Sequence, residues 1–142
     1  MAGGTGSKAK LLRGGCLCGR VEYAVEDAFA YAMNCHCSNC RRATGSAFKP
    51  FAGIGMDRLN LVRGQEALLV YGDPAAAHDL HCATCGSLLY SVLDRSRRAH
   101  IAMGTLIDAP SIRPGGHIFV GSKAAWHDIT DDLPQYHEFP ED

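Results

Sequence analysis

Three cysteines crowd into residues 35 to 40 of the chain, which read CHCSNC. Structural zinc sites usually close with four protein ligands, whereas catalytic zinc sites keep one coordination position open. Three thiols at this spacing therefore predict a zinc site with an open position, formed by Cys35, Cys37 and Cys40.

Such a site favours sulfur chemistry over hydrolysis. Three thiolates give the zinc dication an overall charge of about −1, so the metal is a weaker Lewis acid than one held by neutral histidines. An incoming thiol would nevertheless bind as its thiolate at neutral pH and stay nucleophilic. Two alternatives stay open: His36 or a more distant histidine could complete a closed site, or the three thiols could form a redox relay.

Four further cysteines form two pairs, and glycine follows each pair at once, in CLCG (residues 16–19) and CATCG (residues 82–86). A glycine there permits a turn with positive φ, in which backbone amides can curl around a bound thiolate. In the alternative, each pair is an independent redox or buried-thiol motif, but an apolar run follows Cys85 where a redox motif would lead into a helix. The pairs therefore predict one closed structural zinc site of Cys16, Cys18, Cys82 and Cys85.

Short strands must position these cysteines. From Arg20 the residues RVEYAVED alternate, with Val21, Tyr23 and Val25 on one face, as in a half-buried strand. Similar short apolar runs, mostly bounded by turn residues, follow at AFKPFAGI, LNLVRG, ALLVYG, SLLYSVL, AHIAMG and HIFVGS. At most one short helical turn is expected, at residues 38–44, and irregular surface chain is expected at residues 126–142. The sequence thus predicts a mainly β fold.

Size and charge narrow the possible functions. The chain has 142 residues, which favours a single domain over residues 10–142 after a disordered, glycine-rich tail at residues 1–9. A formal net charge of −1 argues against nucleic acid as a partner. No apolar run reaches membrane length and no secretory signal is apparent, so we expect a cytoplasmic protein with reduced thiols and no membrane partner.

Other side chains are candidates for contact with a substrate. The hydroxyl of Thr44 or Ser46 could hydrogen-bond a substrate oxygen. His117 could move a proton, but its place at the start of an apolar strand favours packing or hydrogen bonding. Trp126 is expected to cover the core. Nearby cations could bind substrate carboxylates, although a solvated face is the preferred interpretation for each of Arg41, Arg42 and Lys49.

Five segments together carry a resemblance to a known family: GGCLCGRVEY, CHCSNCRRATGSAF, HCATCGSLLY, HIAMGTLID and RPGGHIFVGSKAAWHDITDDLPQY. In this order and spacing they resemble the glutathione-dependent formaldehyde-activating enzyme family, which also includes centromere protein V. The resemblance covers nearly all of residues 12 to 136. The combined pattern of three cysteine groups is far more specific than any one of its parts.

This resemblance implies a β-tent of stacked antiparallel sheets tied by zinc sites, with two zinc ions per chain as cofactor. By position, the family's structural ligands fall on Cys16, Cys18, Cys82 and Cys85. Its catalytic ligands fall on Cys35, Cys37 and Cys40. The implied reaction joins glutathione and formaldehyde to give S-(hydroxymethyl)glutathione, classed in reverse as a carbon–sulfur lyase, so the partners are a small thiol and a small aldehyde. The alternative is a non-enzymatic, zinc-stabilised binding module.

Overall fold

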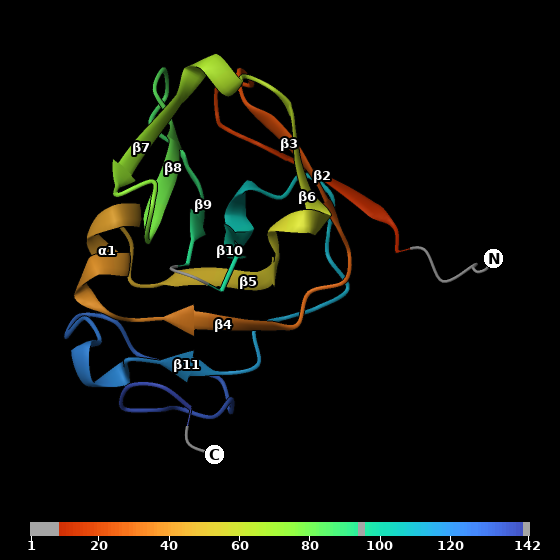
Figure 1. Cartoon of the computed structure of the whole chain (residues 1–142). Helices are drawn as coiled ribbons and strands as arrows, with labels where there is room; N and C mark the ends of the chain where they lie inside the picture. Colours follow the sequence, from red (N-terminus) through yellow and green to blue (C-terminus); the bar gives the residue numbers. More distant parts are fainter. Residues whose placement is uncertain (1–8, 94–95, 141–142) are drawn as a thin grey trace.

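The computed structural model describes residues 9 to 93 and 96 to 140, which fold into two β-sheets (Figure 1). The smaller sheet has the strand order β2-β3-β6, with bounds β2 (Leu11–Gly15), β3 (Glu22–Glu26) and β6 (Leu59–Arg63). The larger sheet has the order β11-β4-β5-β10-β9-β8-β7. Its strands are β4 (Tyr31–Cys35), β5 (Lys49–Gly55), β7 (Leu68–Gly72), β8 (His78–Cys82), β9 (Leu88–Val92), β10 (Arg98–Ala102) and β11 (His117–Ile118).

The helical elements of the described residues are short. They are α1 (Ser38–Thr44), η1 (Met56–Arg58), η2 (Gln65–Ala67), η3 (Met103–Thr105) and η4 (Val120–Ser122). The prediction of a mainly β fold with a helical turn at residues 38–44 is confirmed, but the expectation of at most one helical turn is wrong, because the four 3-10 turns η1 to η4 are present as well. Each of these spans only three residues, too few to show a helical hydrophobic period. The tail predicted at residues 1–9 lies outside the described residues, apart from Ala9.

Each apolar run of the sequence forms a strand, but three strands were not predicted: β2, β4 and β8. Their sequences LLRGG, YAMNC and HDLHC carry glycine, asparagine or histidine where an alternating pattern expects apolar residues. Pairing with neighbours holds them in place instead, since β4 lies on β5 and β8 lies between β7 and β9. All of the described strand pairs are antiparallel except β4 with β11, a parallel pair that the resemblance did not imply.

An apolar core fills the space between the two sheets. Alternation along β3 turns Tyr23 and Val25 inward, where both are fully buried, and Ile54 of β5 packs in the same cluster. Burial of each such side chain stabilises the fold by about 1.5–3 kcal/mol. Cys16 and Cys82 belong to this cluster as well. The core therefore brings the turn after β2 close to the turn after β8, although 66 residues separate the two cysteines.

The strands β4 and β5 carry buried residues on both sides of the sheet, as their register shows. Cys35 lies directly opposite Lys49 in the β4–β5 pair, and residues directly opposite each other project to the same side of a sheet. Phe51, two residues along β5, shares that side, whereas Ile54 faces the core between the sheets. Cys35, Phe51 and Ile118 form a second apolar cluster on this side.

The C-terminal chain lies along β11, below β4 in Figure 1. The backbone N–H of His117 donates to the carbonyl of Pro134, and the N–H of Tyr136 donates to the carbonyl of His117, each over 2.8 Å. This part is irregular, as predicted, but the expectation for Trp126 is wrong because its side chain is 73% exposed. The segment carries Trp126 across the surface and away from both apolar clusters. In the described chain, no helix has the length and apolar character needed to span a membrane.

Candidate metal centres

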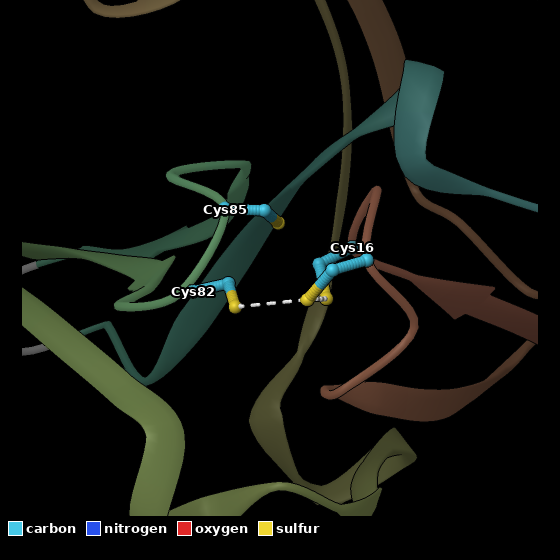
Figure 2. Close-up of side chains that lie close together, drawn as sticks. Cys16, Cys82 and Cys85 are labelled. Carbon is cyan, nitrogen blue, oxygen red and sulfur yellow. Dashed lines mark hydrogen bonds between the residues drawn. The ribbon is translucent and has the colours of Figure 1, made fainter.

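The two outer cysteine pairs meet at one point, as Figure 2 shows for three of their four members. The four sulfur atoms all lie within 4.8 Å of one another; they belong to Cys16, Cys18, Cys82 and Cys85. The Sγ–Sγ distance is 3.6 Å between Cys16 and Cys18 and 3.8 Å between Cys18 and Cys82. A tetrahedron with metal–sulfur bonds of about 2.3 Å has edges of about 3.8 Å. The four sulfurs therefore fit a tetrahedral zinc ion.

Tight turns aim these sulfurs at one another. Gly19 and Gly86, which follow the two pairs, have φ values of 80° and 83°, the positive values expected from the sequence. The backbone N–H of Val21 donates to Cys16 Sγ over 3.2 Å. Hydrogen bonds from the Ser87 side chain and backbone lower the pKa of Cys85 to about 5. This turn thus stabilises the thiolate that zinc requires.

The three central cysteines also converge, at the junction of β4 and α1. Cys35 ends β4, Cys37 is the N-cap residue of α1 and Cys40 lies in its first turn, and their sulfurs lie within 4.8 Å of one another. The backbone N–H of Cys40 donates to Cys37 Sγ over 3.3 Å. A hydrogen bond from the Cys40 thiol lowers the pKa of Cys35 to about 6, and the same pair raises the pKa of Cys40. These soft donors suit zinc, and three ligands leave a coordination position for another atom.

His36, between two of these cysteines, turns away from them. Its side chain is fully buried, and its Nε2 lies 2.8 Å from Nδ1 of His117. Nε2 of His117 in turn lies 3.0 Å from a carboxylate oxygen of Asp131. Because a carboxylate accepts, His117 carries its proton on Nε2, and its Nδ1 accepts from the Nε2–H of His36. Burial is the main cause that lowers the pKa of His36 to about 4, so the ring is neutral.

These hydrogen bonds show which roles His36 and His117 have in the structure. The alternative in which His36 closes the second site is not what the structure adopts, since the described metal-ligand group there consists of cysteines alone. His117 has the hydrogen-bonding role that its strand position favoured, and both of its ring nitrogens are engaged. The hydrogen bond between Asp131 and His117 was not predicted. An acid in an irregular tail gives no periodic signal, and only folding brings it to His117.

The two hydroxyls suggested as substrate contacts already serve the backbone. Oγ1 of Thr44 donates to the carbonyl of Cys40 over 2.8 Å, and Oγ of Ser46 donates to the carbonyl of Phe48 over 2.8 Å. A further distance of 2.8 Å joins the two hydroxyl oxygens. These contacts end α1 and lead the chain into β5. Thr44 and Ser46 can accept a hydrogen bond from a ligand, but their own protons are engaged.

The three candidate cations differ in exposure. Arg42 is exposed and Arg41 is partly exposed on α1, in agreement with a solvated face. Lys49 is only 8% exposed, so the same interpretation is wrong for Lys49. The reason is its register opposite Cys35, which turns its side chain to the inside of the molecule.

A family profile and a curated relative both indicate one family. A family profile described as glutathione-dependent formaldehyde-activating enzyme matches residues 11 to 122, a span that includes all seven cysteines. A protein of Halomonas elongata, provisionally named as a glutathione-dependent formaldehyde-activating enzyme, is 28% identical over 129 residues, covering 84% of this chain and 81% of the relative. A crystal structure of a Rhodobacter sphaeroides protein is 32% identical with a TM-score of 0.57, covering 70% of this chain and 92% of that one.

Proposed function

The chain belongs to the glutathione-dependent formaldehyde-activating enzyme family, and we propose that it is a zinc-dependent carbon–sulfur lyase. Its proposed reaction interconverts glutathione plus formaldehyde and S-(hydroxymethyl)glutathione. The proposal extends to a cytoplasmic setting and to one domain over residues 10–142, which holds two zinc ions. The single observation that carries it is the convergence of three thiols, at the end of β4 and the start of α1, beside a separate four-thiol cluster.

The two clusters support different roles because their ligand numbers differ. Cys16, Cys18, Cys82 and Cys85 would fill a tetrahedron and link the smaller sheet to the larger one. Cys35, Cys37 and Cys40 would hold the second ion with one position free. When bound there, zinc supplies a position in which the incoming thiol is held as its thiolate.

The residues of the chain prepare the second site for this reaction. The backbone N–H of Cys40 in α1 donates to Cys37 Sγ and so stabilises anionic sulfur there. Asp131 and His117 fix the ring of His36, and with it the backbone between Cys35 and Cys37. In the condensing direction, thiolate sulfur forms a bond to the carbonyl carbon, the C=O π electrons move to oxygen, and oxygen takes up the proton that the thiol released. In the reverse direction the carbon–sulfur bond breaks and the proton returns to sulfur.

Exchange NMR tests this function. Carbon-13 formaldehyde and glutathione are mixed with zinc-loaded protein, and the rate of exchange between formaldehyde and S-(hydroxymethyl)glutathione is measured against protein concentration. We expect the rate to rise in proportion to protein and to return to the uncatalysed value in Cys37→Ser. Arg58→Gln, which alters an exposed ion pair with Glu26, serves as the control and should keep the full rate. A wild-type rate equal to the uncatalysed one would support the binding-module alternative and refute the enzyme.

A further inference from the structure

Lys49 is a buried cation beside the three-cysteine cluster. It begins β5 directly opposite Cys35, so the two Cβ atoms are neighbours at about 4.5–5.5 Å on the same side of the sheet. The side chain is 92% buried, since only 8% of the residue is exposed.

The ammonium group of Lys49 lacks a carboxylate partner in the part of the chain that the structure describes. The ion pairs found there join other residues, and no described side-chain hydrogen bond involves the amine. The residue is buried as a whole, but its amine is not among the described side-chain nitrogens that are closed off from solvent, so an incoming anion can reach it. A carboxylate from outside the chain would form an ion pair that no described residue supplies.

A cleft of about 400 Å³ gives such an anion access to Lys49. The C-terminal end of α1 lines one part of it, the turn after Cys85 lines another, and η3 lines a third, so the cleft reaches Cys85 of the four-thiol cluster and the helix that carries Cys40. Lys49 is the one cation among its described lining residues, and none of them is acidic. The other polar members are hydroxyls: Thr44, Ser46, Ser87 and Thr105. The protons of Thr44, Ser46 and Thr105 are donated to backbone carbonyls, which leaves Lys49 as the main group able to bind an anion there.

We propose that this cleft binds a carboxylate of the thiol substrate, with the Lys49 ammonium group as its partner. The inference rests on the proposed function, because it places the substrate sulfur at the three-cysteine cluster. Lys49 then acts as a specificity-determining residue. A thiol that carries a carboxylate a few bonds from its sulfur binds both to the three-cysteine cluster and to Lys49, whereas an uncharged thiol binds to the cluster alone. Two-point attachment also fixes the orientation of the sulfur.

Two probes that differ by one charge test this assignment on the zinc-loaded, full-length protein: N-acetyl-cysteinylglycine and its C-terminal amide. Isothermal titration calorimetry at pH 7 measures the dissociation constant of each. We expect wild-type protein to bind the acid about tenfold more tightly, about 1.4 kcal/mol. In Lys49→Met the acid should lose this advantage while the amide keeps its affinity. Lys49→Arg, which retains the charge, should retain the preference, and Lys10→Met, at an exposed lysine, should behave as wild type.

The contrary results distinguish failure of the Lys49 proposal from failure of the proposed lyase function. Equal binding of both probes to wild-type protein, or an acid preference that survives in Lys49→Met, overturns the role of Lys49 and leaves the lyase standing. Equal weakening of both probes in Lys49→Met also overturns it, since Lys49 would then only balance the charge of the three thiolates. Binding of neither probe to wild-type protein refutes thiol binding at the cluster, and with it both proposals.

Discussion

His36 and His117 lie 81 residues apart in the sequence, yet their rings are joined inside the protein by a hydrogen bond of 2.8 Å from Nε2 to Nδ1. His36 stands between two cysteines of the three-cysteine cluster, and His117 opens β11. Asp131, at the surface end of the chain of contacts, fixes the direction of both bonds by accepting from His117. The C-terminal segment is thereby connected to the three-cysteine cluster.

Removal of the carboxylate should weaken this connection. We expect Asp131→Ala to lower the free energy of unfolding by about 1 kcal/mol, since the N–H of His117 loses a charged acceptor. Urea denaturation of the zinc-loaded protein measures the change. Asp128→Ala, at an exposed position in the same segment, should change it by less than about 0.5 kcal/mol. Equal effects of the two substitutions would mean that the contact contributes nothing.

Loss of His117 itself should cost more. In His117→Leu the Nε2–H of the fully buried His36 has no acceptor, a penalty of about 1–3 kcal/mol in addition to lost packing. We expect a larger drop in unfolding free energy than for Asp131→Ala and a changed nitrogen-15 signal from the His36 ring. His117→Asn offers a side-chain acceptor and should recover part of the loss. No difference between the leucine and asparagine variants would argue against the hydrogen bond.

The two cysteine clusters should respond differently to loss of one ligand. Cys37→Ser should bind one zinc ion per chain in place of two and keep its fold, because the four-thiol cluster is untouched. Cys82 is fully buried in the core between the sheets, so Cys82→Ser should unfold or aggregate, since a structural zinc site contributes directly to folding. Metal analysis and circular dichroism measure both outcomes. Equal loss of stability in the two variants would refute the division of roles.

The pair of Tyr31 and His100 predicts a pH dependence of stability. The Tyr31 hydroxyl oxygen lies 2.7 Å from Nε2 of His100, and burial, followed by the charges of Lys49 and Arg98, lowers the pKa of His100 to about 4. Its pKa in the unfolded chain is about 6.5. The unfolded state therefore binds the proton more readily between these values, and stability falls as the pH drops from about 6.5 to about 4, by at most about 1.4 kcal/mol per unit.

His100→Phe isolates this contribution, because acid also protonates the metal-ligating thiols in both proteins. We expect the stability advantage of wild type over His100→Phe to shrink by about 1 kcal/mol between pH 7 and pH 5.5. Urea denaturation at both pH values gives the two differences. An advantage that is constant or grows towards acid would show that His100 is not held neutral.

Two glycines near the cleft form a matched test of backbone conformation. A Cβ at Gly86 or at Gly104 would meet no atom within 4 Å, but only Gly86 has a positive φ, of 83°. We expect Gly86→Ala to lower the unfolding free energy by about 1–2 kcal/mol and Gly104→Ala to leave it unchanged or raise it slightly. Thermal denaturation compares them. A neutral Gly86→Ala would show that the turn after Cys85 does not need this conformation.

The sequence alone determined how the seven cysteines divide into two groups, and it determined the class of fold. Cysteine spacing, the glycines after the outer pairs and the short apolar runs are local features, and local sterics and hydrophobic periodicity act on neighbouring residues. The helical turn at residues 38–44 was predictable for the same reason. The family followed from the same motifs, in order.

Tertiary structure decided the contacts made between distant residues. Strand register, which sets Lys49 opposite Cys35, depends on the whole sheet, because a shift of one residue would turn every side chain of the strand to the other face. The path of the irregular C-terminal segment brings Asp131 to His117 and leaves Trp126 in solvent. No periodic pattern records such a path. It is fixed by which buried polar groups find partners when the sheets pack.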